Sequence, residues 1–305
     1  MSEYTITEKI KALKEEKNAI ILAHYYVPDD IQQIADYIGD SYYLSKIAAG
    51  TDADVLVFCG VSFMGESAKL LNNEKTVLMP DETADCPMAH MCDVETINSI
   101  RNQYEDVAVV CYINSTAELK MHSDVCVTSS NAEKIVRNLP NQNIFFIPDE
   151  NLAHFIAKKV PEKNFIFNNG YCPIHKEITL EALLSARANY PDALVLTHPE
   201  CTDDVVMHSD FVGSTSEIID FASASDCNVF IIATETGVFY ELKQKNPNKQ
   251  FYPVNEKQVC PGMKLITLEK IAHVLETFDN RVEMPDSVLE SANKPLNEML
   301  KLAAK

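Results

Sequence analysis

Three cysteines are each followed directly by proline, at Cys86, Cys172 and Cys260. The steps from 86 to 172 and from 172 to 260 are 86 and 88 residues, so they come at nearly equal intervals. Thiolate sulfur is a soft ligand that suits zinc or an iron–sulfur cluster. The chain has 9 cysteines, an odd count that disfavours complete pairing in disulfides. The spacing therefore indicates one unit repeated three times, with a metal-binding thiolate near the end of each copy.

Other residues keep the same interval and support the repeat. An aspartate occurs in phase in each copy, and a polar residue ending an apolar run precedes it by twelve positions. These residues are Asp36, Asp124 and Asp210, with His24, Tyr112 and His198 before them. The six remaining cysteines lie mostly in apolar stretches or beside helices, where a small buried side chain is the default interpretation. They are Cys59, Cys92, Cys111, Cys126, Cys201 and Cys227, of which Cys92 and Cys201 lie near candidate site loops.

Length and composition indicate a soluble protein of several domains. A chain of 305 residues with 46% hydrophobic content is long for a single core. Charged residues interrupt the N-terminal region and no apolar run approaches a membrane span, so a cytoplasmic location is expected. The net charge of −19 argues against nucleic acid, which needs a basic surface, but does not exclude small anions.

Short apolar strands alternate with helical segments in each copy, which predicts parallel sheets covered by helices on both faces. The expected fold class is α/β, with three homologous α/β/α sandwich domains, four-stranded parallel sheets and a pseudo-threefold axis. We expect domains at 1–88, 89–175 and 176–264, with the C-terminal segment 265–305 packed against the first. The predicted first strands are 19–23, 107–111 and 193–197, and the last two predicted helices are 267–278 and 286–300.

Candidate site residues follow the first two strands of each copy. Ligands of open parallel sheets bind beyond the carboxyl ends of strands, and helix starts there bind anions. The alternative for the hydroxyl groups is plain helix capping. The candidates are His24 and Tyr26, Tyr112 and Asn114, His198 and Glu200 after first strands, and Ser41, Ser129, Ser130, Ser214 and Thr215 after second strands.

If the three domains face one axis, these loops and the three cysteines share one cavity. His24, His198 and Glu200 would then serve as acid–base groups. Three cysteine ligands would leave one metal coordination position open to water or substrate, where the metal can act as a Lewis acid.

Several motifs together resemble those of one known family. They are Ala23-His24-Tyr25-Tyr26, Ala35-Asp36, Gly39-Asp40-Ser41, Cys86-Pro87-Met88-Ala89, Tyr112-Ile113-Asn114-Ser115-Thr116, Gly170-Tyr171-Cys172-Pro173-Ile174-His175, His198-Pro199-Glu200-Cys201, Gly213-Ser214-Thr215 and Thr234-Glu235-Thr236-Gly237. The chain resembles the quinolinate synthases, iron–sulfur enzymes of bacterial and archaeal NAD biosynthesis. That resemblance covers nearly the whole chain.

The resemblance implies a [4Fe–4S] cluster on Cys86, Cys172 and Cys260, with one iron open. It implies condensation of iminoaspartate with dihydroxyacetone phosphate to quinolinate, a transferase- or lyase-type reaction that releases phosphate and water. L-Aspartate oxidase, which supplies iminoaspartate, is the implied functional partner. The implied catalytic residues are Tyr26, Tyr112, Glu200, His24 and His198. The implied substrate-binding residues are His24, Ser41, Tyr112, Asn114, Ser129, His175, His198, Glu200, Ser214 and Thr215.

Two positions depart from the family's pattern. Family members more often have asparagine at Tyr25, so two adjacent tyrosines compete here for one role, and the register favours Tyr26. Pro261-Gly262-Met263 follows the third cysteine, where longer members carry further cysteines, so a redox switch there is not supported. Two rival interpretations stay open: a zinc hydrolase or lyase using the same three cysteines, and a non-catalytic protein that binds small anions.

Overall fold

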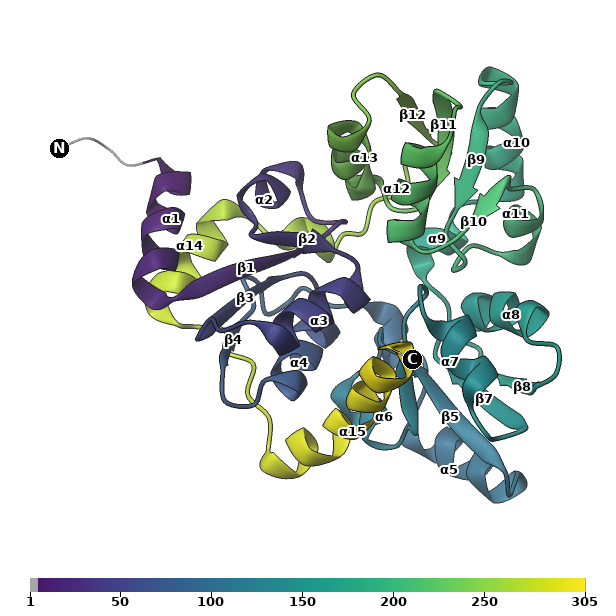
Figure 1. The fold of residues 1–305 in the computed structure, drawn as a ribbon, viewed down its shortest axis with the longest axis horizontal. Helices are drawn as coiled ribbons and strands as arrows, with labels where there is room; N and C mark the ends of the chain where they lie inside the picture. Colours follow the sequence, from purple (N-terminus) through teal and green to yellow (C-terminus); the bar gives the residue numbers. More distant parts are fainter. Residues whose placement is uncertain (1–4, 305) are drawn as a thin grey trace.

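Three separate four-stranded sheets form the centre of the fold in the computed structural model, which describes residues 5–304 (Figure 1). Every strand pairing in the three sheets is parallel, and the spatial order repeats: β2-β1-β3-β4, β6-β5-β7-β8 and β10-β9-β11-β12. The predicted α/β class with three sandwich domains is confirmed. No helix within residues 5–304 combines the length and apolarity needed to cross a membrane.

The first repeat begins with a helix fixed at both ends by its own sequence. Thr5 and Glu8 form a reciprocal capping box at its start, and Asn18 ends it in the left-handed conformation. The strand that follows is almost wholly buried, as expected for a central parallel strand. The elements are α1 (Ile6–Lys17), β1 (Ala19–His24), α2 (Asp29–Ile34), β2 (Tyr37–Gly39), α3 (Ser41–Gly50), β3 (Val55–Cys59), α4 (Ser62–Leu71), β4 (Thr76–Leu78) and η1 (Pro87–His90).

The second and third repeats copy this order. In the second they are α5 (Val94–Gln103), β5 (Val107–Tyr112), α6 (Ala117–Met121), β6 (Val125–Val127), α7 (Ala132–Asn138), β7 (Asn143–Ile147), α8 (Glu150–Lys159), β8 (Asn164–Phe167) and α9 (Pro173–Lys176). In the third they are α10 (Leu180–Asn189), β9 (Leu194–Thr197), α11 (Asp203–Met207), β10 (Phe211–Val212), α12 (Thr215–Ala224), β11 (Val229–Ala233), η2 (Thr236–Val238), α13 (Phe239–Lys245), β12 (Gln250–Pro253) and η3 (Met263–Leu265).

The aspartate that repeats in phase has a structural role. In each copy its carboxylate accepts the backbone N–H of a residue in the first strand, from Ile21, Val109 and Val195, at 2.7, 2.7 and 2.8 Å. Each carboxylate also pairs with a basic side chain of the helix that precedes the first strand of its copy. These pairs are Lys14–Asp36, Arg101–Asp124 and Arg187–Asp210. The repeated aspartate therefore joins the helix, the first strand and the second strand of each copy. Its role is structural and not catalytic.

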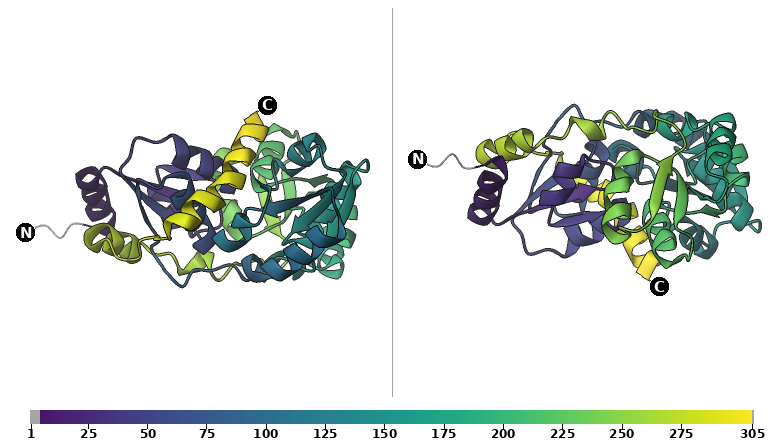
Figure 2. Two further views of the ribbon diagram at one scale, coloured as in Figure 1. Left: turned by 90° about the horizontal axis from the view of Figure 1, so that it is seen from below. Right: turned by 90° about the horizontal axis from the view of Figure 1, so that it is seen from above.

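Two C-terminal helices complete the molecule and tie its parts together. α14 (Leu268–Thr277) packs against α1, in the position that the first helix of a further repeat would take. α15 (Asp286–Ala304) packs against α4 and also against α6, β6 and α7. Figure 2 shows α15, in yellow, running across the junction between the first and second repeats. The segment expected to cover the first domain thus contacts the second as well.

The buried apolar side chains of the described residues form three cores. One continuous core runs through the first and second sheets and both C-terminal helices, whereas the third sheet has a separate core on each face. The predicted domain boundaries at 88, 175 and 264 each fall in the short helical turn after a Cys-Pro step. That the domains divide at these positions stays a prediction.

Candidate active site

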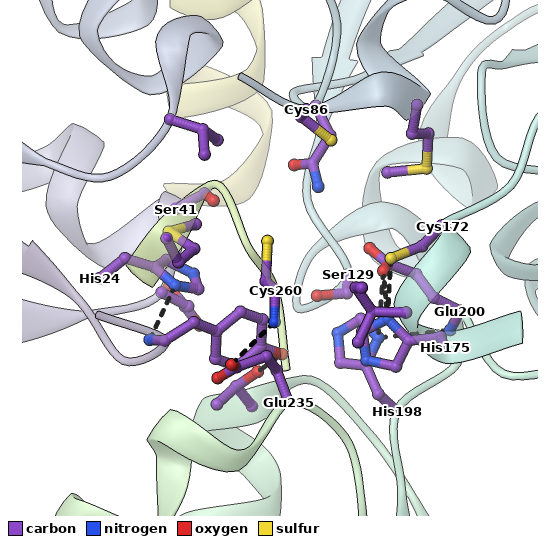
Figure 3. Close-up of a pocket in the computed structure, with 18 of the residues that line it drawn as sticks. His24, Ser41, Cys86, Ser129, Cys172, His175, His198, Glu200, Glu235 and Cys260 are labelled. Carbon is purple, nitrogen blue, oxygen red and sulfur yellow. Dashed lines mark hydrogen bonds and ion pairs between the residues drawn. The ribbon is translucent and has the colours of Figure 1, made fainter. Parts of the chain in front are cut away.

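One cavity lies where the three repeats meet, with about 690 Å³ of space between its walls, part of it open to solvent (Figure 3). All three repeats line it, as the convergence argument expected. The structure brings together every predicted site residue that follows a first strand, and all three Cys-Pro cysteines. The predicted lining residues are His24, Tyr26, Ser41, Cys86, Tyr112, Asn114, Ser129, Cys172, His175, His198, Glu200, Thr215 and Cys260.

Each cysteine precedes a short helical turn whose backbone N–H groups face its sulfur. Proline after the cysteine suits such a turn because its ring fixes φ and it needs no N–H donor there. Burial raises the pKa of the Cys86 thiol to about 12, although the backbone N–H groups of Ala89 and Met88 act to lower it. Burial likewise raises the pKa of Cys172 and of Cys260, again opposed by N–H groups of their own turns. Figure 3 shows the three side chains reaching into the cavity from different directions.

The three thiols fit a cluster better than a single ion. Three thiolates on one zinc would lie roughly 3.8 Å apart, given Zn–S bonds of about 2.3 Å. Within residues 5–304 the group of three donor atoms lying within 4.8 Å of one another is Cys172, His175 and Glu200, without Cys86 or Cys260. Backbone N–H groups aimed at sulfur are also the hydrogen bonds that iron–sulfur clusters use.

Two buried carboxylates hold two of the cysteine loops, and the sequence analysis assigned neither a role. Asp149 accepts the N–H of Cys172 at 3.1 Å and that of Leu152 at 2.7 Å. Glu235 accepts the N–H of Cys260 at 3.0 Å and that of Gly237 at 2.6 Å. Each follows the third strand of its copy by two residues, so the loops are anchored to the sheets in the same way.

Glu200 contacts several of the polar side chains on the cavity wall. Its carboxylate accepts the Tyr112 hydroxyl at 2.5 Å and lies 2.7 Å from His175 Nδ1. Burial alone would raise the pKa of Glu200, but His175 and His198 and the bonds from His175 and Tyr112 hold it well below its usual range. Burial, with the Glu200 charge adding to it, raises the pKa of Tyr112 well above its usual range. The carboxylate is therefore ionised and held by the hydrogen-bond donors around it.

His24 and His198 occupy equivalent turns in the first and third repeats. The N–H of Tyr26 donates to His24 Nδ1 at 3.2 Å, and the N–H of Glu200 donates to His198 Nδ1 at 3.3 Å. Nδ1 is then an acceptor in both rings, so a neutral ring carries its proton on Nε2. Burial lowers the pKa of each histidine to about 3, so both rings are neutral at physiological pH.

The Tyr26 hydroxyl is held at the junction of the first and third repeats. It lies 2.7 Å from Thr215 Oγ1 and 2.8 Å from Thr234 Oγ1. Tyr25, its neighbour and competitor for the family role, does not line the cavity and packs instead into a core of the third repeat. Lys264 fixes the Tyr26 main chain, since its Nζ donates to the Tyr26 carbonyl at 2.5 Å and lies 2.9 Å from Glu235.

Among the predicted hydroxyl groups after second strands, Ser41, Ser129 and Thr215 line the cavity, and Thr128 of the second repeat lines it as well. Ser214 does not line it. Its side chain caps α12 in a reciprocal capping box with Glu217, and Ser214 is fully buried. Ser130 bonds to the Thr128 hydroxyl at 2.9 Å. Asn114 contributes a buried Oδ1 that has no hydrogen-bond partner within the described residues and so can accept a bond from a ligand.

The other six cysteines do not line the cavity. Cys59, Cys111, Cys126 and Cys201 are buried, whereas Cys92 and Cys227 are partly exposed.

Comparison with known proteins places this chain in a family. A sequence model of the family described as quinolinate synthetase A protein matches residues 8–301. The chain belongs to the quinolinate synthetase A family. A relative from Caldicellulosiruptor saccharolyticus named quinolinate synthase is 50% identical over 98% of both chains. Relatives of the same name from Clostridioides difficile and Fusobacterium nucleatum are 51% and 48% identical, over 98% and 97% of this chain and 98% and 99% of theirs.

Membership of the quinolinate synthetase A family confirms the resemblance found in the motifs. The relatives' name identifies an enzyme acting on small molecules, and a largely apolar cavity with a few polar side chains, at the meeting point of three repeats, is of the kind that binds them.

Proposed function

We propose that this protein is a quinolinate synthase that condenses iminoaspartate with dihydroxyacetone phosphate and releases phosphate and water. The observation that carries the proposal is the cavity itself, where Glu200, bonded to Tyr112 and His175, lies among the three Cys-Pro cysteines. The reaction would be a transferase- or lyase-type condensation within NAD biosynthesis, and L-aspartate oxidase would supply iminoaspartate. A cytoplasmic location fits these small substrates, of which iminoaspartate is unstable.

Cys86, Cys172 and Cys260 would hold a [4Fe–4S] cluster. The donor set supports this, because each thiol faces the cavity with backbone N–H groups turned toward its sulfur. When bound, a cluster with three cysteine ligands supplies a Lewis-acidic iron that can polarise a hydroxyl group.

Substrate anions would bind to hydroxyl groups and amides, because the lining residues include neither lysine nor arginine. Ser41 and Thr215 each occupy the first position of a helix of 10 residues, where free N–H groups and the helix dipole favour carboxylate or phosphate. Asn114 offers its unpartnered Oδ1 to a hydroxyl or amine donor of the substrate.

Proton transfer would fall to Glu200 and its neighbours. An ionised carboxylate excluded from water can take a proton from carbon next to a carbonyl group, as enolisation and imine formation require. Tyr112 shares the hydrogen bond and would hold the carboxylate in place as its charge changes. Neutral His24 and His198 would donate from Nε2 to substrate oxygen without adding a formal charge to the site.

The experiment is an assay of protein purified and reconstituted with iron and sulfide without oxygen. We expect broad visible absorption, and quinolinate and phosphate formed from iminoaspartate and dihydroxyacetone phosphate. Binding of both substrates without turnover, by protein holding its full iron and sulfide, would instead favour the anion-binding interpretation. Zinc in place of iron in active protein would favour a zinc enzyme.

A further inference from the structure

A compact donor set lies inside the cavity and uses only one of the three Cys-Pro cysteines. Cys172 Sγ, a ring nitrogen of His175 and a carboxylate oxygen of Glu200 all lie within 4.8 Å of one another. His175 Nδ1 is 3.2 Å from Cys172 Sγ and 2.7 Å from the Glu200 carboxylate. We propose that this triad is a separate binding site for a single zinc ion, formed by the protein when it carries no cluster.

The donor types and their order suit zinc. Thiolate, imidazole and carboxylate are its usual protein ligands, and three protein ligands with one water make an open tetrahedral site. Cys172 precedes α9 and His175 lies three residues later, so one short helical turn supplies both donors. Glu200 comes from the loop after β9, in a different repeat.

The surroundings already orient the histidine for a metal. His175 Nε2 lies 2.9 Å from Thr234 Oγ1, a bond that leaves Nδ1 free to bind the ion while Nε2–H donates to the hydroxyl. The Tyr112 hydroxyl donates to the Glu200 carboxylate, so the second ligand is also held by a neighbour. Such supporting hydrogen bonds are typical of built metal sites.

Zinc would enter with small movements. Ligands at about 2.0–2.3 Å from the ion stand roughly 3.3–3.8 Å apart, so the His175–Glu200 pair must open by about 0.6 Å. The ion takes the place of the Cys172 thiol proton, which leaves to solvent, and it binds the lone pair on Nδ1 of the His175 tautomer that carries its single proton on Nε2. His175 and Glu200 are buried, so water is largely excluded from the site.

Zinc and the cluster would then exclude each other, because both need Cys172. This consequence, unlike the zinc site itself, rests on the proposed cluster. Protein loaded with zinc first should fail to take up iron and sulfide, whereas the same protein without zinc should take them up. If metal-free protein takes up no cluster either, the proposed cofactor fails while the zinc measurement below still stands.

The experiment titrates metal-free, reduced protein with zinc against a chromophoric chelator. We expect one zinc per chain, bound at least about 100-fold more weakly by Cys172→Ser, His175→Gln and Glu200→Gln. Cys86→Ser and Cys260→Ser are the matched controls and should bind zinc as the unchanged protein does. Weakened binding in either control, or unchanged binding in all three ligand variants, would overturn the proposal.

X-ray absorption of the zinc-loaded, unsubstituted protein provides a second test that needs no variant to fold. The proposed site predicts one sulfur and two or three nitrogen or oxygen neighbours around zinc. Cobalt in place of zinc should give the charge-transfer absorption of a single thiolate. Two or three sulfur neighbours would mean that the cluster cysteines bind the ion together, and the proposal would be wrong.

Discussion

Glu200 combines two properties that rarely occur together in a carboxylate: it is buried, and its pKa lies below the usual range. Burial favours the neutral form, so the donors around it must outweigh that cost. Tyr112 and His175 do so from the second repeat, Tyr112 at the end of β5 and His175 in α9, whereas Glu200 belongs to the third repeat. The carboxylate is thus kept charged where a substrate proton can reach it.

Replacing Glu200 with glutamine tests this role. Glutamine keeps the size and one acceptor oxygen but cannot take a proton, so kcat should fall by about 10²–10⁴-fold. Iron and sulfide content should stay unchanged, because the cysteine loops are untouched. Glu177→Gln, which changes an exposed carboxylate outside the cavity, is the control and should keep full turnover. Steady-state kinetics with metal analysis decide, and near-normal turnover in Glu200→Gln would exclude the assignment.

His24 makes stability depend on pH in a predictable direction. Its pKa is lowered to about 3 by burial, so between pH 3 and pH 6.5 the unfolded chain binds a proton that the folded chain cannot. Stability from this group is therefore complete above pH 6.5 and is lost as pH falls, by up to about 1.4 kcal/mol per pH unit.

Urea unfolding across that pH range measures the effect. His24→Asn keeps an acceptor for the Tyr26 N–H but removes the titration, so it should flatten the pH profile by about that slope. The exposed His208 serves as the comparison, and His208→Asn should keep the original profile. Equal slopes in the His24 variant and the unchanged protein would show that burial of this ring does not couple folding to protons.

At the scale of elements, strand ends supply most of the site and could be located from sequence. Alternating apolar strands and helices fix where each strand ends, and the parallel order brings those ends to one edge. The anchoring carboxylates Asp149 and Glu235 were missed for a physical reason. Val61 holds the equivalent position in the first repeat, two residues after β3. A search for residue types shared by all three copies therefore does not find the two carboxylates.

Ser214 and Thr215 show how neighbours at one helix start divide two tasks. Ser214 caps α12, whereas Thr215 lines the cavity and bonds to the Tyr26 hydroxyl. Residue type could not separate them, because either hydroxyl group fits either task, but position in the repeat does, since Ser41, Ser129 and Thr215 each follow the in-phase aspartate by five residues. Register with Ser41 and Ser129 identifies Thr215 as the residue equivalent to them.

The two alanine variants should therefore differ. Ser214→Ala should lose about 0.5–2 kcal/mol of stability with little change in KM, since it removes only a cap. Thr215→Ala should raise KM for the anionic substrates and leave the melting temperature nearly unchanged. Thermal melts beside steady-state kinetics provide both readouts, and each variant is the control for the other. The reverse pattern would show that Ser214 binds substrate.

At the scale of the molecule, the threefold repetition predicted the convergence of three loops on one cavity. It could not predict where α15 lies, because an amphipathic tail helix can cover any exposed apolar surface, and here it spans α4 and α6. That helix joins the first and second repeats through a continuous core. The third repeat has its own cores and meets the first through contacts near Tyr25 and Tyr26.

Gly237 lies at that contact, and its lack of a side chain is what permits it. A Cβ there would come within 2.6 Å of Tyr26 Cα and 2.7 Å of the Tyr25 carbonyl oxygen, both backbone atoms that cannot turn aside. Gln32 reinforces the contact from the first repeat, donating from Nε2 to the Gly237 carbonyl at 3.0 Å. Space at this one position therefore sets how closely two walls of the cavity approach each other.

Gly237→Ala should push the third repeat away from Tyr26 and widen the site. Overpacking of this kind typically costs about 1–3 kcal/mol, and kcat should fall because the Tyr26 hydroxyl and Glu200 move apart. The matched control is Gly50→Ala, where a Cβ meets no atom within 4 Å; at this helix position alanine should be neutral or slightly stabilising. Melting temperature and kcat of both variants are the measurements. Full activity in Gly237→Ala would mean that the site tolerates a looser junction, and that catalysis does not depend on the close approach of the first and third repeats.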